Sequence, residues 1–171
     1  MMTKQSLMPW WDHIRCANGI ALRLVEALPA DQVDACPIPN MRSPKDVLVH
    51  VYGGILRAIP PGVVRGEIAM LDEKAAAAGI RDKDELLRYC RESWDEADRA
   101  TQAVTDAQLQ ATVKTPWGMN MPGHFCMSVI HDEFFHHRGQ LYAMLRALGQ
   151  DVPMMWDFEH NAPEFRRRAQ A

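Results

Sequence analysis

Apolar residues recur at steps of three and four along most of this chain, the spacing that places them on one face of an α-helix. The first such stretch predicts a helix over residues 7–28, ended by Pro29. A second helix is predicted over residues 43–59, because Ser43 can cap it and Pro44 suits the first helical turn. The run Pro60-Pro61-Gly62 is expected to end this second helix.

Two further helices follow from the same periodicity. The third is predicted to begin at Asp82, with Glu85 placed for a capping box, and to continue to about Val104. The fourth is predicted from Pro122 to Leu148, where Gly149 stops it. The chain is therefore expected to form an all-α four-helix bundle, as a single domain over residues 1–171.

The connecting segments are less regular. Residues 30–42 read as a loop, and residues 75–78 as one or two helical turns within an otherwise unclear stretch. The sequence VKTPWGMNMPG, residues 113–123, predicts a short extended turn or hairpin. The tail from Gln150 is expected to pack over the bundle ends. Because residues 60–81 form a long connection, simple up-down-up-down topology is not assumed.

Composition and charge narrow the function. The chain has 171 residues, 47% apolar and 24% charged, with a net charge of −3, which is typical of a folded globular protein. This charge argues against a dedicated nucleic-acid binder. The one compact basic run, residues 166–168, is interpreted as a solvated helix end.

We expect a cytoplasmic protein with no membrane contact. The N-terminus lacks the apolar core of a signal peptide, and no run of about 18 apolar residues is found. The four cysteines, Cys16, Cys36, Cys90 and Cys126, are scattered without a CxxC pair. This spacing favours reduced thiols over a disulfide scaffold or a zinc knuckle.

Two polar residues interrupt the apolar stripe of the last helix. Glu133 and His137 lie one turn apart on the stripe that includes Ile130 and Leu141. A buried carboxylate costs several kcal/mol unless it is paired or bound to a cation. Two interpretations stay open: an internal Glu133–His137 ion pair, or a metal site completed by a facing helix.

His50, at the edge of the apolar face of the second helix, is the natural third ligand. Its alternative role is that of a core-edge histidine bonded to a carbonyl. The neighbouring Gly53-Gly54 pair is unusual inside a helix and would admit the close approach of another helix or a ligand. Two imidazoles and a carboxylate suit Zn²⁺ and leave a coordination position open, the mark of a catalytic site.

The remaining polar side chains of the last helix are weaker candidates for metal ligands. His136 could form an ExxH pair with Glu133, and Arg138 and Gln140 could hydrogen-bond to the ligands from outside. His131 points about 120° away from His137. A weaker site of His131 with His124 is disfavoured, and His13 and His160 have no helical partner that the pattern identifies.

The sequence HHRGQLYAMLRALG, followed by VPMMW, resembles the DinB/YfiT-like superfamily. SPKDVLVHV and the TPWG turn support the resemblance by their order and spacing. It implies a down-up-up-down four-helix bundle, often dimeric, with a divalent metal on three ligands. Members usually carry three histidines; here Glu133 replaces one, similar to the ExxxH variant of the mycothiol-dependent maleylpyruvate isomerase branch. The implied ligands are His50, Glu133 and His137, and a carboxylate ligand also tolerates Ni²⁺, Mn²⁺ or Fe²⁺.

The resemblance implies two function hypotheses. The first is a metal-dependent thiol S-transferase or isomerase that joins a low-molecular-weight thiol to an electrophile. The second is a stress-induced metal-binding bundle without turnover, acting through a partner or by sequestering metal. An open cleft at the metal would favour the first and a closed site the second. A nuclease is not supported, because the sequence offers neither a basic groove nor a two-metal carboxylate cluster.

Adjacent Trp10 and Trp11 point about 100° apart on the first helix, so one is expected in the core and the other partly exposed. An exposed tryptophan often anchors an interface. With the frequent dimerisation that the resemblance implies, this predicts a homodimer with the first helix near its interface.

Overall fold

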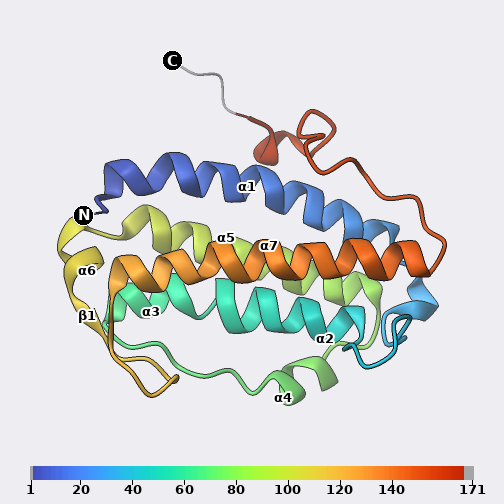
Figure 1. The fold of residues 1–171 in the computed structure, drawn as a ribbon, viewed down its shortest axis with the longest axis horizontal. Helices are drawn as coiled ribbons and strands as arrows, with labels where there is room; N and C mark the ends of the chain where they lie inside the picture. Colours follow the sequence, from blue (N-terminus) through green and yellow to red (C-terminus); the bar gives the residue numbers. More distant parts are fainter. Residues whose placement is uncertain (1, 168–171) are drawn as a thin grey trace.

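The computed structural model describes residues 2–167, and its long helices pack side by side as a bundle (Figure 1). These helices are α1 (Lys4–Ala27), α5 (Lys83–Ala103), α7 (Gly123–Ala147) and a composite of α2 (Pro44–Val49), the π-helix η2 (His50–Leu56) and α3 (Ile59–Arg65). Figure 1 shows α1 and α7 running in one direction, with α5 and the composite helix running in the other. The expected all-α, down-up-up-down four-helix bundle is confirmed.

Shorter elements connect the bundle helices. They are η1 (Ala30–Gln32), α4 (Glu73–Ala78), α6 (Asp106–Gln110), β1 (Thr112–Val113), β2 (Met121–Pro122) and η3 (Pro163–Phe165). β1 and β2 pair antiparallel, which confirms the predicted hairpin. The helix α6 was not predicted, because five residues are too few to show helical periodicity; Thr105 and Gln108 cap it reciprocally.

The two adjacent tryptophans of α1 take different places. Trp11 is buried, stacks on Trp94 with ring centroids 5.1 Å apart, and donates its indole N–H to Asp98 at 2.7 Å. Trp10 stays partly exposed and stacks on His131. The expectation of one tryptophan inside and one partly outside is confirmed. The buried pair fixes α1 against α5, since Trp94 and Asp98 belong to that helix.

The predicted start of the first helix was one turn late. Helix α1 begins at Lys4 rather than at residue 7, because Thr3 and Ser6 form a capping box. Hydrophobic periodicity does not report such a cap, since both residues are polar. The third helix begins as predicted: the Asp82 side chain accepts from the backbone N–H of Glu85. The Glu85 carboxylate, however, binds Arg81 rather than completing the box.

The predicted end of the second helix was wrong. Pro60 and Pro61 lie in the first turn of α3, which continues to Arg65 and ends at Gly66 with φ of 85°. Backbone N–H groups in a first turn need no intrahelical acceptor, so prolines there do not break a helix. The change of helical type at η2 is what places both prolines in a new first turn.

The composite helix, residues 44–65, is more apolar than its helical periodicity indicated. Residues 44–65 are long and apolar enough by composition to cross a membrane, with a mean hydropathy of 1.4. However, 72% of the 18-residue window to which this hydropathy value applies is buried inside the bundle, as expected of a core helix. Its packing between α5 and α7 therefore accounts for its composition.

The C-terminal segment lies along α1, not over the bundle ends as predicted (Figure 1). Arg23 of α1 donates to the carbonyl oxygen and to the carboxylate of Asp157, both at 2.9 Å. Arg15 donates to the carbonyl oxygens of Glu164 and Arg166. One buried and one half-buried arginine of α1 thus hold the segment, a role that helical periodicity cannot indicate.

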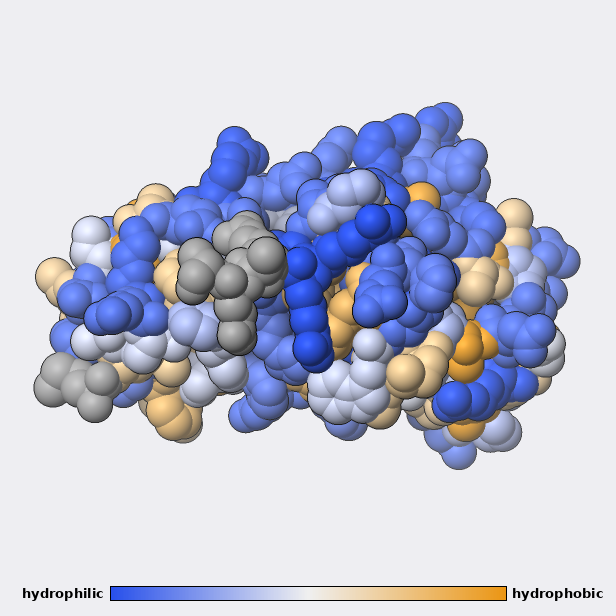
Figure 2. Space-filling view, turned by 90° about the horizontal axis from the view of Figure 1, so that it is seen from above, coloured by the Kyte–Doolittle hydropathy of each residue, from blue (hydrophilic) through white to orange (hydrophobic). Residues whose placement is uncertain are grey.

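Within the basic run, Arg166 and Arg167 follow the 3-10 helix η3 rather than an α-helix, and Arg168 lies outside the described residues. The guanidinium of Arg167 lies over the ring of Phe158 at 5.0 Å. The face that carries α1 and this segment is mostly hydrophilic, with small separate hydrophobic patches (Figure 2).

Candidate metal centre

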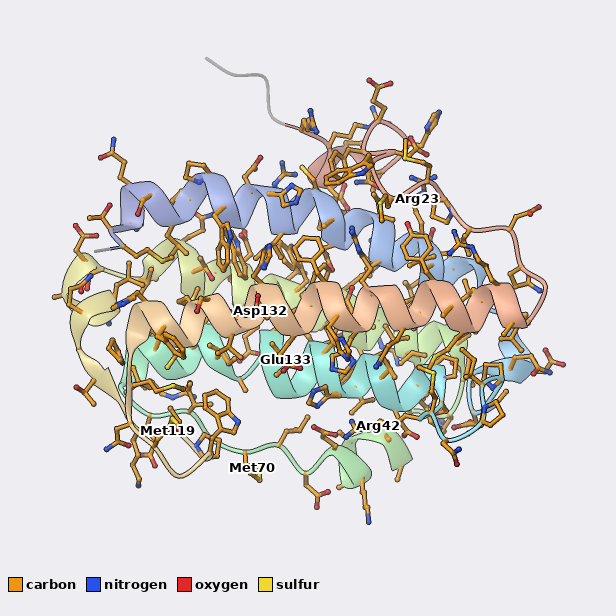
Figure 3. All side chains as sticks on the ribbon, viewed as in Figure 1. Arg23, Arg42, Met70, Met119, Asp132 and Glu133 are labelled. Atoms are coloured by element: carbon orange, nitrogen blue, oxygen red, sulfur yellow. The ribbon has the colours of Figure 1, made fainter. Side chains whose placement is uncertain are left out.

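The structure brings together the three side chains singled out from the sequence. One ligand atom from each of His50, Glu133 and His137 lies within 4.8 Å of the others. His50 is the first residue of η2, while Glu133 and His137 lie one turn apart on α7. Oε2 of Glu133 is 3.4 Å from Nε2 of His50 and 3.1 Å from Nε2 of His137. Figure 3 shows Glu133 directed from α7 toward the helix that carries His50.

Each imidazole is held through its other nitrogen. Nδ1 of His50 lies 2.6 Å from Oε1 of Glu73, the first residue of α4. Nδ1 of His137 lies 2.8 Å from Oε1 of Gln140. Because both oxygens are acceptors, each Nδ1 donates its proton to them, and each Nε2 is directed at Glu133. Metal-ligating histidines in proteins are typically held by this kind of outer hydrogen bond.

Both Nε2 atoms face the carboxylate of Glu133. Burial lowers the pKa of His137, outweighing the opposite effect of its bond to Gln140, so the neutral ring is favoured near neutral pH. A neutral ring held by Gln140 has no proton for Glu133, which weakens the interpretation as an ion pair. Two imidazole nitrogens and one carboxylate oxygen are ligands that a divalent cation such as Zn²⁺ accepts. The donor set therefore fits a metal ion.

The Gly53-Gly54 pair makes room for this arrangement. A Cβ atom at residue 54 would lie 3.2 Å from Oε1 of Glu73 and 3.6 Å from Nδ1 of His50. A Cβ atom at residue 53 would lie 1.9 Å from the hydroxyl of Tyr89, so a side chain there would displace the tyrosine. π-Helical turns such as η2 are frequent at functional sites, and here the turn carries both glycines and His50.

The other residues predicted near the site are placed as follows. Gln140 contacts His137 and, through Nε2, the ring of His136 at 3.0 Å, so His136 joins the site only indirectly. The guanidinium of Arg138 lies over the ring of Phe135 at 4.7 Å, and its described contacts do not include the three candidate ligands.

The remaining histidines have other partners. His131 pairs with Asp132, and Nδ1 of His124 donates to the carbonyl oxygen of Leu109. His13 stacks on Phe135 and Trp156 and contacts Phe158 edge-on, and His160 pairs with Asp157. Over residues 2–167, His50, Glu133 and His137 are the one group of His, Cys, Asp or Glu side chains close enough to hold a metal.

Glu73 is the residue that sequence reasoning missed. It lies in the stretch whose structure was unclear from the sequence, 23 residues after His50. Its second oxygen lies 3.2 Å from Arg42, so the carboxylate is itself held in place. No helical spacing links it to His50, and only the folded path of the long connection brings the two together.

A cleft of about 450 Å³ adjoins the cluster. His50 and Glu73 form one end, and its walls include Ile55, Met70 and Trp117. The Glu133 side chain retains 37% of its exposure, so the cluster itself is open to solvent. Of the three candidate ligands, His50 lines this cleft, so a small molecule has a route to that side of the cluster, which a closed structural site would not offer.

Comparisons with known proteins agree with this architecture. A family profile described as the DinB family matches residues 1–167. A DinB-like protein of Bacillus subtilis has a TM-score of 0.65 at 15% identity, over 81% of this chain and 90% of that chain. A protein from Exiguobacterium sibiricum described as a putative DinB family member has a TM-score of 0.61 at 22% identity, over 91% and 96%.

A third structure carries a functional description. YfiT from Bacillus subtilis, described as a probable metal-dependent hydrolase with an unusual four-helix bundle topology, has a TM-score of 0.63 at 17% identity. The similarity covers 88% of this chain and 92% of that chain. No curated protein sequence matches this chain. At these identities the structural matches establish the shared fold and nothing finer.

Proposed function

This chain belongs to the DinB family, and from that premise we propose that it is a metal-dependent enzyme whose ion is held by His50, Glu133 and His137. The observation that carries the proposal is the convergence of two Nε2 atoms on one carboxylate oxygen, at 3.4 and 3.1 Å. Zn²⁺ suits two imidazoles and a carboxylate best, with Ni²⁺, Mn²⁺ and Fe²⁺ as substitutes.

Access to the site favours catalysis over storage. Three protein ligands leave a divalent ion with an open coordination position, where it acts as a Lewis acid and lowers the pKa of a bound nucleophile. Glu73 and Gln140 hold the two imidazole rings, which keeps both Nε2 atoms directed at the Glu133 carboxylate, where the ion would be held. The adjoining cleft provides room for a second reactant. A bundle that only sequestered metal would need neither the opening nor the cleft.

The nucleophile in our first candidate reaction is a low-molecular-weight thiol, as the family resemblance suggests. The thiol sulfur would form a bond to an electrophilic carbon while the bond from that carbon to its leaving group breaks. The thiol proton would pass to solvent or to the leaving group. The side chains of the cluster would serve to orient the reactants and to stabilise the thiolate, with no residue forming a covalent intermediate.

A thiol screen tests this reaction. The Zn²⁺-loaded protein is incubated with several low-molecular-weight thiols and either an epoxide or a chlorinated electrophile, and loss of thiol is followed. We expect a rate above that of the metal-free protein for at least one thiol. Equal rates with and without metal, across all the thiols, would contradict thiol transfer.

Hydrolysis is the second candidate. Two histidines and a glutamate also form the zinc site of hydrolytic metalloproteases, and the fold is shared with YfiT, described as a probable metal-dependent hydrolase. A second assay, with an activated ester or amide and no thiol, distinguishes the two, because a hydrolase would consume that substrate without any thiol. Turnover that needs no thiol would replace the first candidate with the second.

A further inference from the structure

The cleft beside the candidate metal centre has two chemically different ends. His50 and Glu73 form its polar end, together with Asp72 and Lys74. The rest of the lining is apolar and comes from η2, from residues 68–71 and from the turn of the hairpin, which contributes Pro116 and Trp117. A volume of about 450 Å³ lies within the usual range of small-ligand sites.

Among residues 2–167, Trp117 is the one tryptophan for which the structure gives no ring contact. The chain has five tryptophans, and within residues 2–167 the other four each stack on another aromatic or histidine ring. Trp117 is instead 41% exposed and lines the cleft. An indole ring left open on a cleft wall is a stacking surface for an aromatic ligand.

The apolar walls are fixed in place before any ligand arrives. The backbone N–H of Ile68 donates to Lys114 at 2.9 Å, and that of Lys114 donates to Gly66 at 2.9 Å. These bonds join the segment that carries Met70 to the strand that leads into the Trp117 turn. Gly118 adopts φ of 81°, and the hydroxyl of Thr115 donates to the carbonyl of Met119, which closes the turn. The tryptophan is therefore presented by a preformed loop.

From these observations we propose that the cleft binds a small substrate with an aromatic group, stacked on Trp117, and with its polar reactive end at His50. This inference rests on the proposed metal-dependent function, because it assigns the cleft to the substrate of that site. Neither the donor set nor the fold by itself implies a substrate with an aromatic group. Met70, 74% exposed at the rim, would cover the outer edge of the bound ring.

Binding of two neutral amides tests the proposal without requiring turnover. Phenylacetamide carries an aromatic ring, and butyramide is its aliphatic counterpart. Each is titrated into Zn²⁺-loaded and metal-free protein while the tryptophan indole N–H signals are followed by NMR. We expect phenylacetamide to shift the Trp117 signal and to bind about 3- to 10-fold more tightly than butyramide.

Three variants complete the test. Trp117→Ala should weaken phenylacetamide binding about 3- to 10-fold, whereas Trp117→Phe should retain most of it. Trp156→Ala, which removes an exposed tryptophan outside the cleft, should leave binding unchanged. Equal binding of the two amides, or unaltered binding by Trp117→Ala, would overturn the aromatic site. If the protein failed to retain Zn²⁺ when loaded but still bound phenylacetamide, the proposed metal-dependent function would be overturned and the aromatic site would stand.

Discussion

Nδ1 of His50 lies 2.6 Å from Oε1 of Glu73, a contact between a core helix and the first residue of a short helix in the long connection. Arg42 holds the other oxygen of the same carboxylate. The connection therefore does more than join two helices of the bundle, because it orients one candidate ligand. This contact is the basis of the first prediction.

Replacing Glu73 by Ala should weaken metal binding about 10- to 100-fold, the usual effect of losing the outer partner of a ligating histidine. Glu73→Gln should have a smaller effect, because an amide oxygen can still accept the Nδ1 proton. Calorimetric titration with Zn²⁺ measures both. Glu67→Gln is the matched control, since Glu67 lies in the same connection and pairs with Lys114. Unchanged affinity in Glu73→Ala would contradict the positioning role.

His50→Ala and His137→Ala should each abolish stoichiometric metal, because each removes one of three proposed ligands. Elemental analysis of the purified variants is the measurement, with circular dichroism to confirm that each is folded. His131→Ala is the matched control on α7, and its metal content should stay at the wild-type level, since its ring pairs with Asp132 and stacks on Trp10. Full metal content in His50→Ala would remove η2 from the site.

Glu133→Gln separates the metal site from an internal ion pair. It keeps the shape of the side chain and removes the charge, so metal affinity should fall by more than about 100-fold. The metal-free variant should lose less than about 1 kcal/mol of unfolding free energy, because the side chain is 37% exposed. Thermal and chemical unfolding measure this. A loss of about 3–5 kcal/mol, with no metal in the wild type, would support the ion pair.

His13 should make the stability of the metal-free protein depend on pH. Burial lowers its pKa, and the charges of Arg138, His131 and Arg167 act in the same direction, while Asp12 opposes them. The unfolded chain therefore binds this proton more readily than the folded one. The contribution of His13 is fully present above its unfolded pKa of about 6.5 and is lost as pH falls toward the lower folded value.

The measurement is the melting temperature of the metal-free protein between about pH 7.5 and pH 5. The pKa of Glu85 is lowered to about 2 by its bond to Arg81, so this carboxylate stays ionised throughout the range. His13→Gln should reduce the slope, because glutamine does not titrate. An identical slope in the variant would show that His13 is not responsible.

The protein is expected to be a homodimer with α1 near the interface, where Trp10 stays partly exposed. Light scattering at micromolar concentration should then give twice the mass of 19.4 kDa. Trp10→Ala should shift the equilibrium toward the monomer, because exposed tryptophans often anchor interfaces. A monomeric mass for the wild type would refute the prediction.

The sequence by itself determined the four long helical stretches and the inward-facing polar residues, because helical periodicity is a local property. The stripe that contains Glu133 and His137 follows from their spacing alone, and the pairing of that stripe with His50 needed only the expectation of a bundle. Helix ends were less predictable where polar caps or prolines in a new first turn decided them, as at Thr3 and Pro60.

Only the tertiary structure decided what surrounds those residues. The contact of Glu73 with His50, the cleft and the exposed ring of Trp117 all depend on the path of residues 66–82 and on the bonds that tie it to the hairpin. The C-terminal segment likewise follows α1 because Arg15 and Arg23 hold its carbonyl oxygens. Contacts between segments far apart in sequence leave no periodic pattern along the chain, so their partners become visible only after folding has placed them side by side.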